Sequence, residues 1–341
     1  MRIFFLANFY FDLYKPIFAE LKRQGHDVFL QEDNYMNWEY NHRNLNKYKK
    51  CLYKFYRYIG NTEVNYWKRK IKENPEYSKP YDVFFCINGV SFSPYLLNHL
   101  RKFNPQIKAS LYLWDTNKYF DFFRYNDCFD KVLTFDVEDA ESSEKVGVLP
   151  SFWFPTDPRP VKYAMSIVGS DHDDRAEIVS KVYEQLESAG LKSCFRVVHL
   201  QPKPFLGWRS KLKRYKKVHA QQLKDWEEMM QKPYMYGEKV PVAEVIQMID
   251  ESECILDTDM PIQTGATERV IWALARGKKV MSTNYNLAKM PFYNKKRMCF
   301  IDRENPVIDI SFLKSEEGKT PDPYFEQLRI DNWVKNFIYF D

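Results

Sequence analysis

Arg269 lies in the first turn of a predicted helix, over 267–276, which follows a predicted strand over 254–256 and a loop. A helix N-terminus offers unpaired N–H groups and a partial positive charge, and both favour a bound diphosphate. In the loop, Gly265 would let the backbone approach such an anion closely. The Arg269 guanidinium would neutralise phosphate oxygens. The alternative is an ordinary helix start with a solvated arginine.

A second loop of this kind follows the predicted strand over 163–168. Gly169 and Ser170 end that strand, and Arg175 opens the next predicted helix, over 175–189. The predicted anion site therefore draws on both loops. Its residues are Gly169, Ser170, Arg175, Gln263, Thr264, Gly265, Thr267, Glu268 and Arg269.

Asp115 directly follows a predicted strand over 109–114. A carboxylate in such a position can act as a general base toward a hydroxyl group, and a helix-capping or turn aspartate is the alternative. Asn88 and Gly89 follow the predicted strand over 81–87, and Asn8 follows the one over 2–7. We expect these three residues to line the pocket of a hydroxyl-bearing substrate beside Asp115.

Two acidic clusters, Asp257-Thr-Asp259 and Asp171-His-Asp173-Asp174, carry the oxygen ligands that hard cations prefer. Helix N-termini and arginines can neutralise a diphosphate without a metal, so we expect no divalent ion and no bound cofactor. The six histidines show no ligand spacing. The six cysteines are scattered and include no C-x-x-C pair, as in a cytosolic protein with reduced thiols.

The elements that must position these residues alternate between strands and helices, which predicts parallel sheets covered on both faces. The pattern breaks over 154–162, where Pro155, Pro158 and Pro160 suit a linker, and then restarts. The sequence thus predicts an α/β chain of two doubly wound, Rossmann-like domains facing a cleft, over 1–155 and 162–320. The remaining 321–341 is predicted to be a C-terminal helix, which could cross back to the first domain.

Composition narrows the class of protein. The 341 residues are 45% hydrophobic and 28% charged, with a net charge of +5, which excludes a disordered, collagen-like or coiled-coil chain. No apolar run approaches the roughly 18 residues of a spanning helix. The apolar N-terminus is interrupted by Asn8 and lacks a cleavage site, so it indicates a strand rather than a signal peptide. We therefore expect a cytoplasmic protein.

The segment over 43–72 holds ten Lys/Arg against one acid, with aromatics between them. Such a segment suits an anionic membrane surface or a lipid-linked substrate. A solvated helical face is the alternative, and nucleic acid is the least favoured partner. The predicted patch consists of Lys47, Lys49, Lys50, Lys54, Arg57, Trp67, Lys68, Arg69 and Lys70.

Taken in order, several of these motifs resemble the GT-B glycosyltransferases. The run Gln263-Thr-Gly-Ala-Thr-Glu-Arg269 within 236–284 is similar to their donor half, and 110–116 and 167–170 resemble other parts. The likeness is greatest to bacterial polysaccharide-type and CgeB-like enzymes. It implies transfer of a hexose or related sugar from a nucleotide-sugar donor to a glycan or lipid-linked glycan. The setting would be surface polysaccharide synthesis (lipopolysaccharide or capsule), with the enzyme peripheral on the inner face of the cytoplasmic membrane.

This chain departs from the family pattern at two places. Trp272 stands where the pattern has a glutamate that grips the donor ribose, and the loop over 7–12 lacks the glycine-rich turn of many GT-B enzymes. Two alternatives therefore stay open. One is a non-transferase nucleotide-sugar enzyme, such as an epimerase, and the other is an inactive scaffold that binds sugar or nucleotide.

Overall fold

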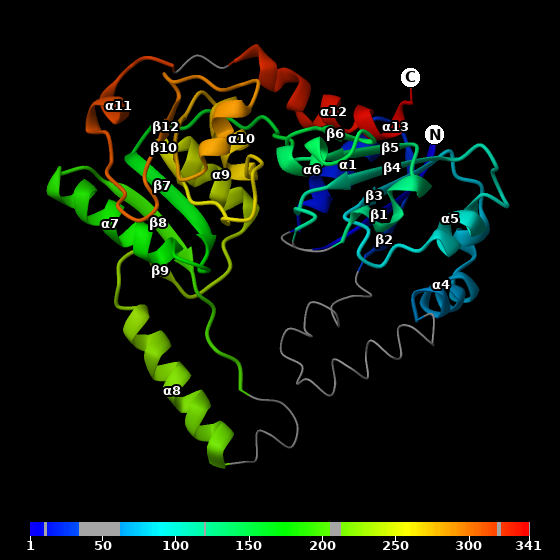
Figure 1. The fold of residues 1–341 in the computed structure, drawn as a ribbon, viewed down its shortest axis with the longest axis horizontal. Coiled ribbons are helices and arrows are strands. Elements are labelled where there is room, and N and C mark those ends of the chain that lie inside the picture. Colours follow the sequence, from blue (N-terminus) through cyan, green and yellow to red (C-terminus); the bar gives the residue numbers. More distant parts are fainter. Residues whose placement is uncertain (10–11, 34–61, 119–120, 205–212, 319–321, 341) are drawn as a thin grey trace. The chain divides into compact units, whose positions relative to one another are not determined.

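Two parallel sheets, each of six described strands, organise the chain, and each sheet belongs to a separate unit. The computed structural model describes residues 1–9, 12–33, 62–118, 121–204, 213–318 and 322–340. Unit 1 comprises Met1–Phe152, Ile262–Gly265 and Gln327–Asp341, and unit 2 comprises Trp153–Pro261 and Ala266–Glu326. Figure 1 shows the elements of both units along the sequence. The predicted α/β class with two doubly wound units is confirmed.

The sheet of unit 1 has the strand order β2-β1-β3-β4-β5-β6, and all neighbouring strands are parallel. Its strands are β1 (Arg2–Ala7), β2 (Asp27–Glu32), β3 (Val83–Ile87), β4 (Lys108–Leu113), β5 (Lys131–Thr134) and β6 (Val146–Val148). The central strands β1 and β3 are buried along almost their whole length. Parallel strands covered on both faces are continuous apolar runs, and this is the pattern that predicts them.

The last strand of this sheet, β6, is short. β6 ends at Val148, and the last ladder bond runs from the Leu149 N–H to the Thr134 carbonyl, at 2.8 Å. Pro150 follows and has no N–H with which to continue the ladder.

The helical segments of unit 1 connect and cover these strands. They are α1 (Tyr14–Arg23), α4 (Thr62–Glu73), η3 (Pro75–Ser78), α5 (Pro94–Leu100), η4 (Phe123–Cys128), α6 (Val137–Glu141), α12 (Ile330–Trp333) and α13 (Lys335–Ile338). The sequence favours their ends: Ser93 caps α5 and Pro94 opens it, while Gly25 takes a φ of 84° just after α1.

The C-terminal residues complete the core of unit 1. The Phe337 ring stacks on Phe85 of β3 with centroids 4.6 Å apart, and its carbonyl accepts from the Ser110 hydroxyl of β4 at 2.8 Å. The indole Nε1 of Trp333 donates to the Pro150 carbonyl at 3.0 Å. Since Trp333 and Phe337 are fully buried, α12 and α13 are part of this core rather than a tail.

The sheet of unit 2 has the order β12-β11-β10-β7-β8-β9, again parallel throughout. Its strands are β7 (Tyr163–Ser170), β8 (Ser193–Val198), β9 (Met235–Tyr236), β10 (Ser252–Asp257), β11 (Lys279–Ser282) and β12 (Met298–Phe300). Its helical segments are α7 (Arg175–Ser188), α8 (Lys213–Met229), α9 (Val242–Asp250), α10 (Glu268–Ala275), η6 (Tyr285–Lys289), α11 (Ile310–Lys314) and, entering unit 1, η7 (Pro323–Leu328).

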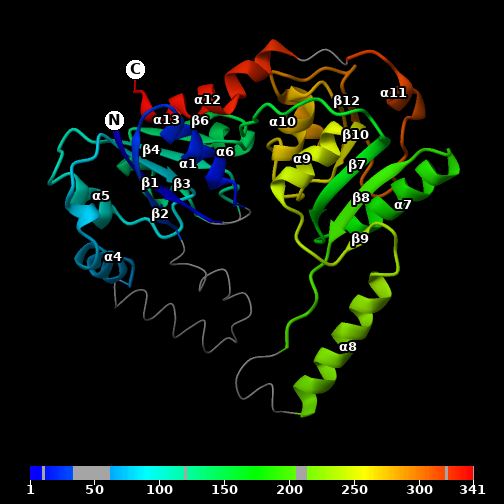
Figure 2. The same cartoon turned by 180° about the vertical axis from the view of Figure 1, so that it is seen from behind.

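Helix α8 extends away from the sheet of its own unit, as Figures 1 and 2 show from opposite sides. Near its C-terminal end it is fixed by Trp226, whose Nε1 donates to the His199 carbonyl at 2.7 Å. Its first half carries the exposed Arg214, Lys216 and Lys217. No helix among the described residues combines the length and the apolar character needed to cross a membrane.

Candidate active site

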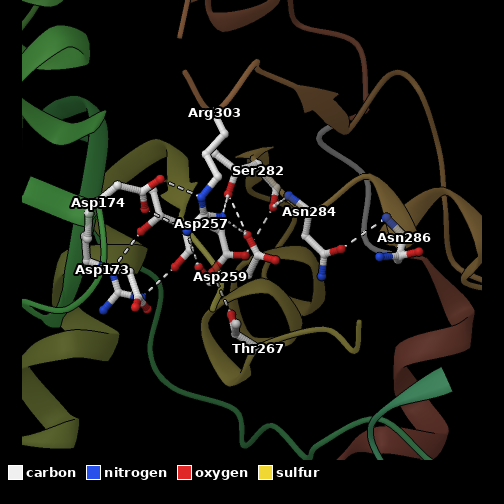
Figure 3. A network of polar contacts seen from close by, with 12 residues as sticks. Asp173, Asp174, Asp257, Asp259, Thr267, Ser282, Asn284, Asn286 and Arg303 are labelled. Atoms are coloured by element: carbon white, nitrogen blue, oxygen red, sulfur yellow. Dashed lines mark hydrogen bonds and ion pairs between the residues drawn. The ribbon is translucent and has the colours of Figure 1, made fainter. Parts of the chain in front are cut away.

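In unit 2, polar side chains gather where β7, β10 and β11 end, which is the edge at which open parallel sheets bind ligands. Asp257 closes β10, and its side chain is only 1% exposed. One carboxylate oxygen accepts from the Thr267 hydroxyl at 2.8 Å, and the other accepts from the Ser282 hydroxyl at 3.2 Å. Figure 3 shows these residues within one network.

Arg269 is the cation that this network presents at the start of α10. One terminal nitrogen donates to Asp257 at 3.0 Å, and the side chain keeps 20% of its surface exposed. Its Nε is buried and has no hydrogen-bond partner among the described residues. A buried N–H without a partner is costly, so a ligand oxygen placed there would be favoured.

The helix start itself is built as the sequence predicts. Thr267 is the N-cap of α10, its hydroxyl accepting from the Val270 N–H at 3.4 Å. Glu268 is the first helical residue and is half-buried. Trp272, in contrast, is almost fully buried and packs edge-on against Phe154 with centroids 6.1 Å apart. The position that holds a ribose-gripping glutamate in the resembled pattern therefore belongs to the interior of unit 2.

Arg175 does not have the predicted role of an open phosphate ligand. Its guanidinium is buried, donating to the Thr258 hydroxyl at 2.7 Å and to the carbonyls of Thr258 and Ser170 at 2.5 Å each. Burial lowers the pKa of this arginine. Gly169 makes room for it, because a Cβ there would lie 2.5 Å from the Arg175 guanidinium. Arg175 thus ties the ends of β7 and β10 together.

The segment before α10 also differs from expectation, because Ile262–Gly265 belongs to unit 1. The Thr264 N–H and hydroxyl donate to Asp136 at 2.8 and 2.6 Å. A Cβ at Gly265 would lie 2.4 Å from Phe135, so the glycine is required by this contact rather than by an anion. Gln263, in the same segment, is half-buried. The structure therefore divides the predicted diphosphate loop and leaves Thr267 to Arg269 with unit 2.

Arg303 joins the loops of this edge, and no sequence motif singled it out. It forms a two-pronged pair with Asp174 at 2.7 and 2.8 Å, and donates to the carboxylate of Asp259 at 3.0 Å. It therefore links the loop after β7 to the loop after β10 (Figure 3). Burial raises the pKa of Asp259, while the hydroxyl of Thr283 and the charge of Arg303 lower it.

Two histidine–aspartate pairs lie on the same edge. The Nδ1 atom of His172 is 2.8 Å from Asp173, and the Nδ1 atom of His199 is 2.7 Å from Asp171. Asp173 has a φ of 53°, in the left-handed region that few residues other than glycine adopt. No ligand spacing is found among the histidines of the sequence, and neither of these two was singled out there.

The acidic clusters do not form a metal centre among the described residues. Asp257 and Asp259 are instead occupied by arginines and hydroxyl groups. The five cysteines within the described ranges are all free thiols.

In unit 1, the structure brings Asp115 and Asn88 together where β4 and β3 end. The Asn88 amide donates to the Asp115 carboxylate at 2.7 Å, and its own oxygen accepts from the Trp114 N–H at 3.0 Å. Burial raises the pKa of Asp115, and the Asn88 hydrogen bond only partly opposes this. A raised pKa is what a general base operating near neutral pH requires.

The loop after β3 is held firmly, and its main anchor was missed by the sequence analysis. Asp33 follows β2 and accepts from the N–H groups of Val90 and Ser91 at 2.7 Å each. From the other side, Trp67 donates to the Ser91 carbonyl at 2.7 Å and Arg124 to the Val90 carbonyl at 2.9 Å. Asn88 and Gly89, both at positive φ, are thereby set in place. Asn8 lies just after β1 and is half-buried.

The predicted basic patch is only partly described. Lys68 and Arg69 are exposed on α4, and Lys70 is half-buried. Trp67, however, is 0% exposed and lies in the core of unit 1, so its assignment to a surface patch is wrong. Its large apolar ring stabilises the fold more when it is buried in the core than when it is exposed at the surface. Lys47, Lys49, Lys50, Lys54 and Arg57 lie outside the described residues.

No protein-family model matches the chain, and no curated protein matches it in sequence. Among solved structures it is similar to the lipopolysaccharide outer core galactosyltransferase WaaB in its apo form, with a TM-score of 0.51 and 13% identity over 99% of this chain and 98% of that one. It is also similar to a structure described as trehalose-6-phosphate from E. coli bound with UDP-2-fluoro glucose, with a TM-score of 0.56 and 11% identity over 99% and 98% of the two chains.

At identities this low the likeness establishes the fold, namely the pair of Rossmann-like units found in GT-B glycosyltransferases. The finer resemblance to the CgeB-like group stays a prediction.

Proposed function

We propose that this protein is a GT-B glycosyltransferase that moves a sugar from a nucleotide-sugar to a hydroxyl group of a glycan. Unit 2 binds the nucleotide-sugar at the edge formed by the ends of β7, β10 and β11. Unit 1 binds the acceptor at the ends of β3 and β4, where Asp115 is the base.

The observation that carries this proposal is the geometry of Arg269. It stands at an N-capped helix start, is oriented by the buried Asp257, and has a buried Nε that lacks a partner among the described residues. A diphosphate oxygen would satisfy that Nε and would also be stabilised by the N-terminus of α10. Gly169 and Ser170 would border the same subsite.

On the acceptor side, the acceptor oxygen attacks the anomeric carbon and the bond from that carbon to the diphosphate oxygen breaks. The acceptor proton passes to Asp115, and the negative charge that develops on the diphosphate is stabilised at Arg269 and α10. Because these groups can carry the charge, we propose that no divalent metal is required. Asn88, which is buried and holds Asp115, and the half-buried Asn8 would line the acceptor subsite.

The finer assignments are also proposals. We infer that the acceptor is a lipid-linked intermediate of bacterial surface polysaccharide synthesis, and that the protein works at the cytoplasmic face of the membrane. The exposed Lys68 and Arg69 on α4 support this, since cationic residues favour anionic lipid surfaces.

Calorimetric titration of the full chain with UDP, GDP, ADP, dTDP and CMP, with Mg²⁺ or with EDTA, tests the donor site. We expect one nucleoside diphosphate to bind equally well under both conditions. The variant R269M should bind it about tenfold or more weakly, because a charged hydrogen bond is lost. R159M, which removes a half-exposed arginine of the same unit, should bind normally.

Four results would contradict the proposal. Binding that requires Mg²⁺ overturns metal independence, and an unchanged Kd in R269M overturns the donor site. Conversion of a nucleotide-sugar without any acceptor would favour an epimerase. Binding without turnover of any sugar would favour the inactive scaffold.

A further inference from the structure

The proposed donor edge of unit 2 is short of available positive charge. Five aspartates lie along it, at positions 171, 173, 174, 257 and 259, against three arginines, Arg175, Arg269 and Arg303. Arg175 is buried against carbonyls, and Arg303 is occupied by Asp174 and Asp259. Among the described residues of this edge, only Arg269 keeps a guanidinium nitrogen ready for a ligand. A diphosphate carries two negative charges, so a second cationic partner would be favoured.

His172 is placed to be that partner. It lies in the loop between β7 and α7, and its backbone is fixed because its carbonyl accepts from the Arg175 N–H at 3.3 Å. The imidazole is 31% exposed, so it is neither a core residue nor a fully solvated one. Its Nδ1 lies 2.8 Å from the carboxylate of Asp173, a residue that has a positive φ.

The charged groups that face the imidazole are Asp173 of the same loop, Arg175 at the start of α7 and Arg269 of α10. Burial lowers the pKa of His172, and the charges of Arg175 and Arg269 lower it further, while Asp173 acts in the opposite sense. The ring is therefore neutral near pH 7 in the free protein. The loop of His172 is also tied to the end of β10, because Arg175, whose N–H donates to the His172 carbonyl, binds Thr258 through its guanidinium.

We propose that His172 is a second ligand of the donor diphosphate and that it takes up a proton when a nucleotide-sugar binds. This inference rests on the proposed function and names how the donor is recognised. A bound diphosphate adds negative charge beside the imidazole, where Arg175 and Arg269 otherwise lower the pKa of the ring, and so it stabilises the imidazolium. Donor affinity is then highest below the pKa of the free ring and falls as pH rises through the pKa of the bound one.

The proton has a defined destination. Because the Asp173 carboxylate can only accept, Nδ1 carries the hydrogen in the neutral ring and Nε2 holds the lone pair. On binding, Nε2 takes a proton from solvent and donates it in a hydrogen bond to a phosphate oxygen. No covalent bond changes, and the same proton returns to solvent when the nucleotide leaves.

Isothermal titration in several buffers at about pH 7 tests this directly, because the buffers differ in ionisation enthalpy and the measured heat reports the protons taken up. The probe is a nucleotide-sugar, drawn from UDP-glucose, GDP-mannose, ADP-glucose and dTDP-glucose, whose linked diphosphate has no group that titrates in this range. For the wild type we expect net proton uptake and about tenfold tighter binding at about pH 5.5 than at about pH 8.

The matched variants are H172Q and H199Q, each of which removes one histidine of the two aspartate-paired rings on this edge. We expect H172Q to bind without proton uptake and with an affinity that changes less than about twofold across the same pH range. H199Q should behave as the wild type, and thermal melts check that both variants fold. Proton uptake that persists in H172Q, or that disappears only in H199Q, overturns the assignment. If no nucleotide-sugar binds the wild type, the proposed function fails first.

Discussion

At the scale of single residues, Asp115 is the group on which the proposed chemistry depends most. We expect D115N to lower kcat/KM by about 10²- to 10⁴-fold, because the acceptor proton loses its base. In the wild type, kcat/KM should fall on the acid side through a pKa above the usual aspartate range, since burial raises it. A pH profile of D115N that kept this acid limb would show that another group is responsible.

The same substitution has an opposite effect on stability. Burial raises the pKa of Asp115 in the folded state above its unfolded value, so the carboxylate destabilises the fold once pH exceeds both values. D115N should therefore melt about 2–4 °C higher than the wild type at neutral pH, which corresponds to roughly 1 kcal/mol. This difference should shrink as pH falls toward the unfolded pKa, where both side chains are neutral.

Arg303 should matter for the integrity of the donor edge. We expect R303M to lose about 3–5 kcal/mol of unfolding free energy, because it leaves the buried Asp259 without its charge partner. The matched control is R196M, which breaks the more exposed pair with Glu244 and should cost under about 1 kcal/mol. Urea unfolding measures both, and equal losses would contradict the buried-pair argument.

Residue types and order predicted which loops carry polar groups, but not how each group is satisfied. Arg175 is occupied by Thr258, which is 83 residues away, and Thr264 by Asp136, which is 128 residues away. Such partners are set by tertiary packing and leave no local pattern. Trp67 was misjudged for a different reason: its basic neighbours are exposed, but helical periodicity turns its own side chain inward.

At the scale of elements, apolar runs and breaker residues predicted most strands of both sheets within a residue or two. The prediction worked because strands buried on both faces have a continuous apolar sequence. It missed α8, whose mostly exposed residues and basic first half resemble a loop more than a packed helix. Short helices such as α6 were also missed, since a five-residue element has too little periodicity to detect.

The C-terminal helices should be essential to unit 1. We expect W333A in α12 to destabilise that unit by about 3–5 kcal/mol, because the ring is fully buried and its Nε1 bonds Pro150. V307A, which shortens a side chain that is 64% exposed in unit 2, should change stability by less than about 0.5 kcal/mol. Chemical denaturation distinguishes the two variants. An unchanged free energy of unfolding in W333A would refute the role assigned to α12.

The basic face of α4 provides a test of the lipid-linked acceptor. We expect K68E/R69E to weaken binding to phosphatidylglycerol-containing vesicles by about tenfold or more, given about 1 kcal/mol for each basic residue near the surface. The charge-matched control K192E/K314E alters two exposed lysines of unit 2 and should bind almost normally. Sedimentation with neutral phosphatidylcholine vesicles gives the baseline. Equal losses in both variants would indicate a non-specific charge effect.

At the scale of the whole molecule, each unit has a hydrophobic core of its own. We therefore expect calorimetry to resolve two unfolding transitions. A nucleotide-sugar at about 100 times its Kd should stabilise unit 2 alone, raising its free energy of unfolding by about 2.7 kcal/mol. W333A should lower the free energy of unfolding of unit 1 alone. A single transition moved by both changes would show that the units unfold together.

The path of the chain has a consequence for how the protein is made. Unit 1 includes Met1–Phe152 but is closed by Gln327–Asp341, which are translated after nearly all of unit 2. Until then, the face of its sheet that Phe337 covers is bare, whereas nearly all of unit 2 has already been translated. The half that starts first is therefore finished last, and nascent chains are expected to expose apolar β-sheet surface, a target for chaperones, throughout the synthesis of unit 2.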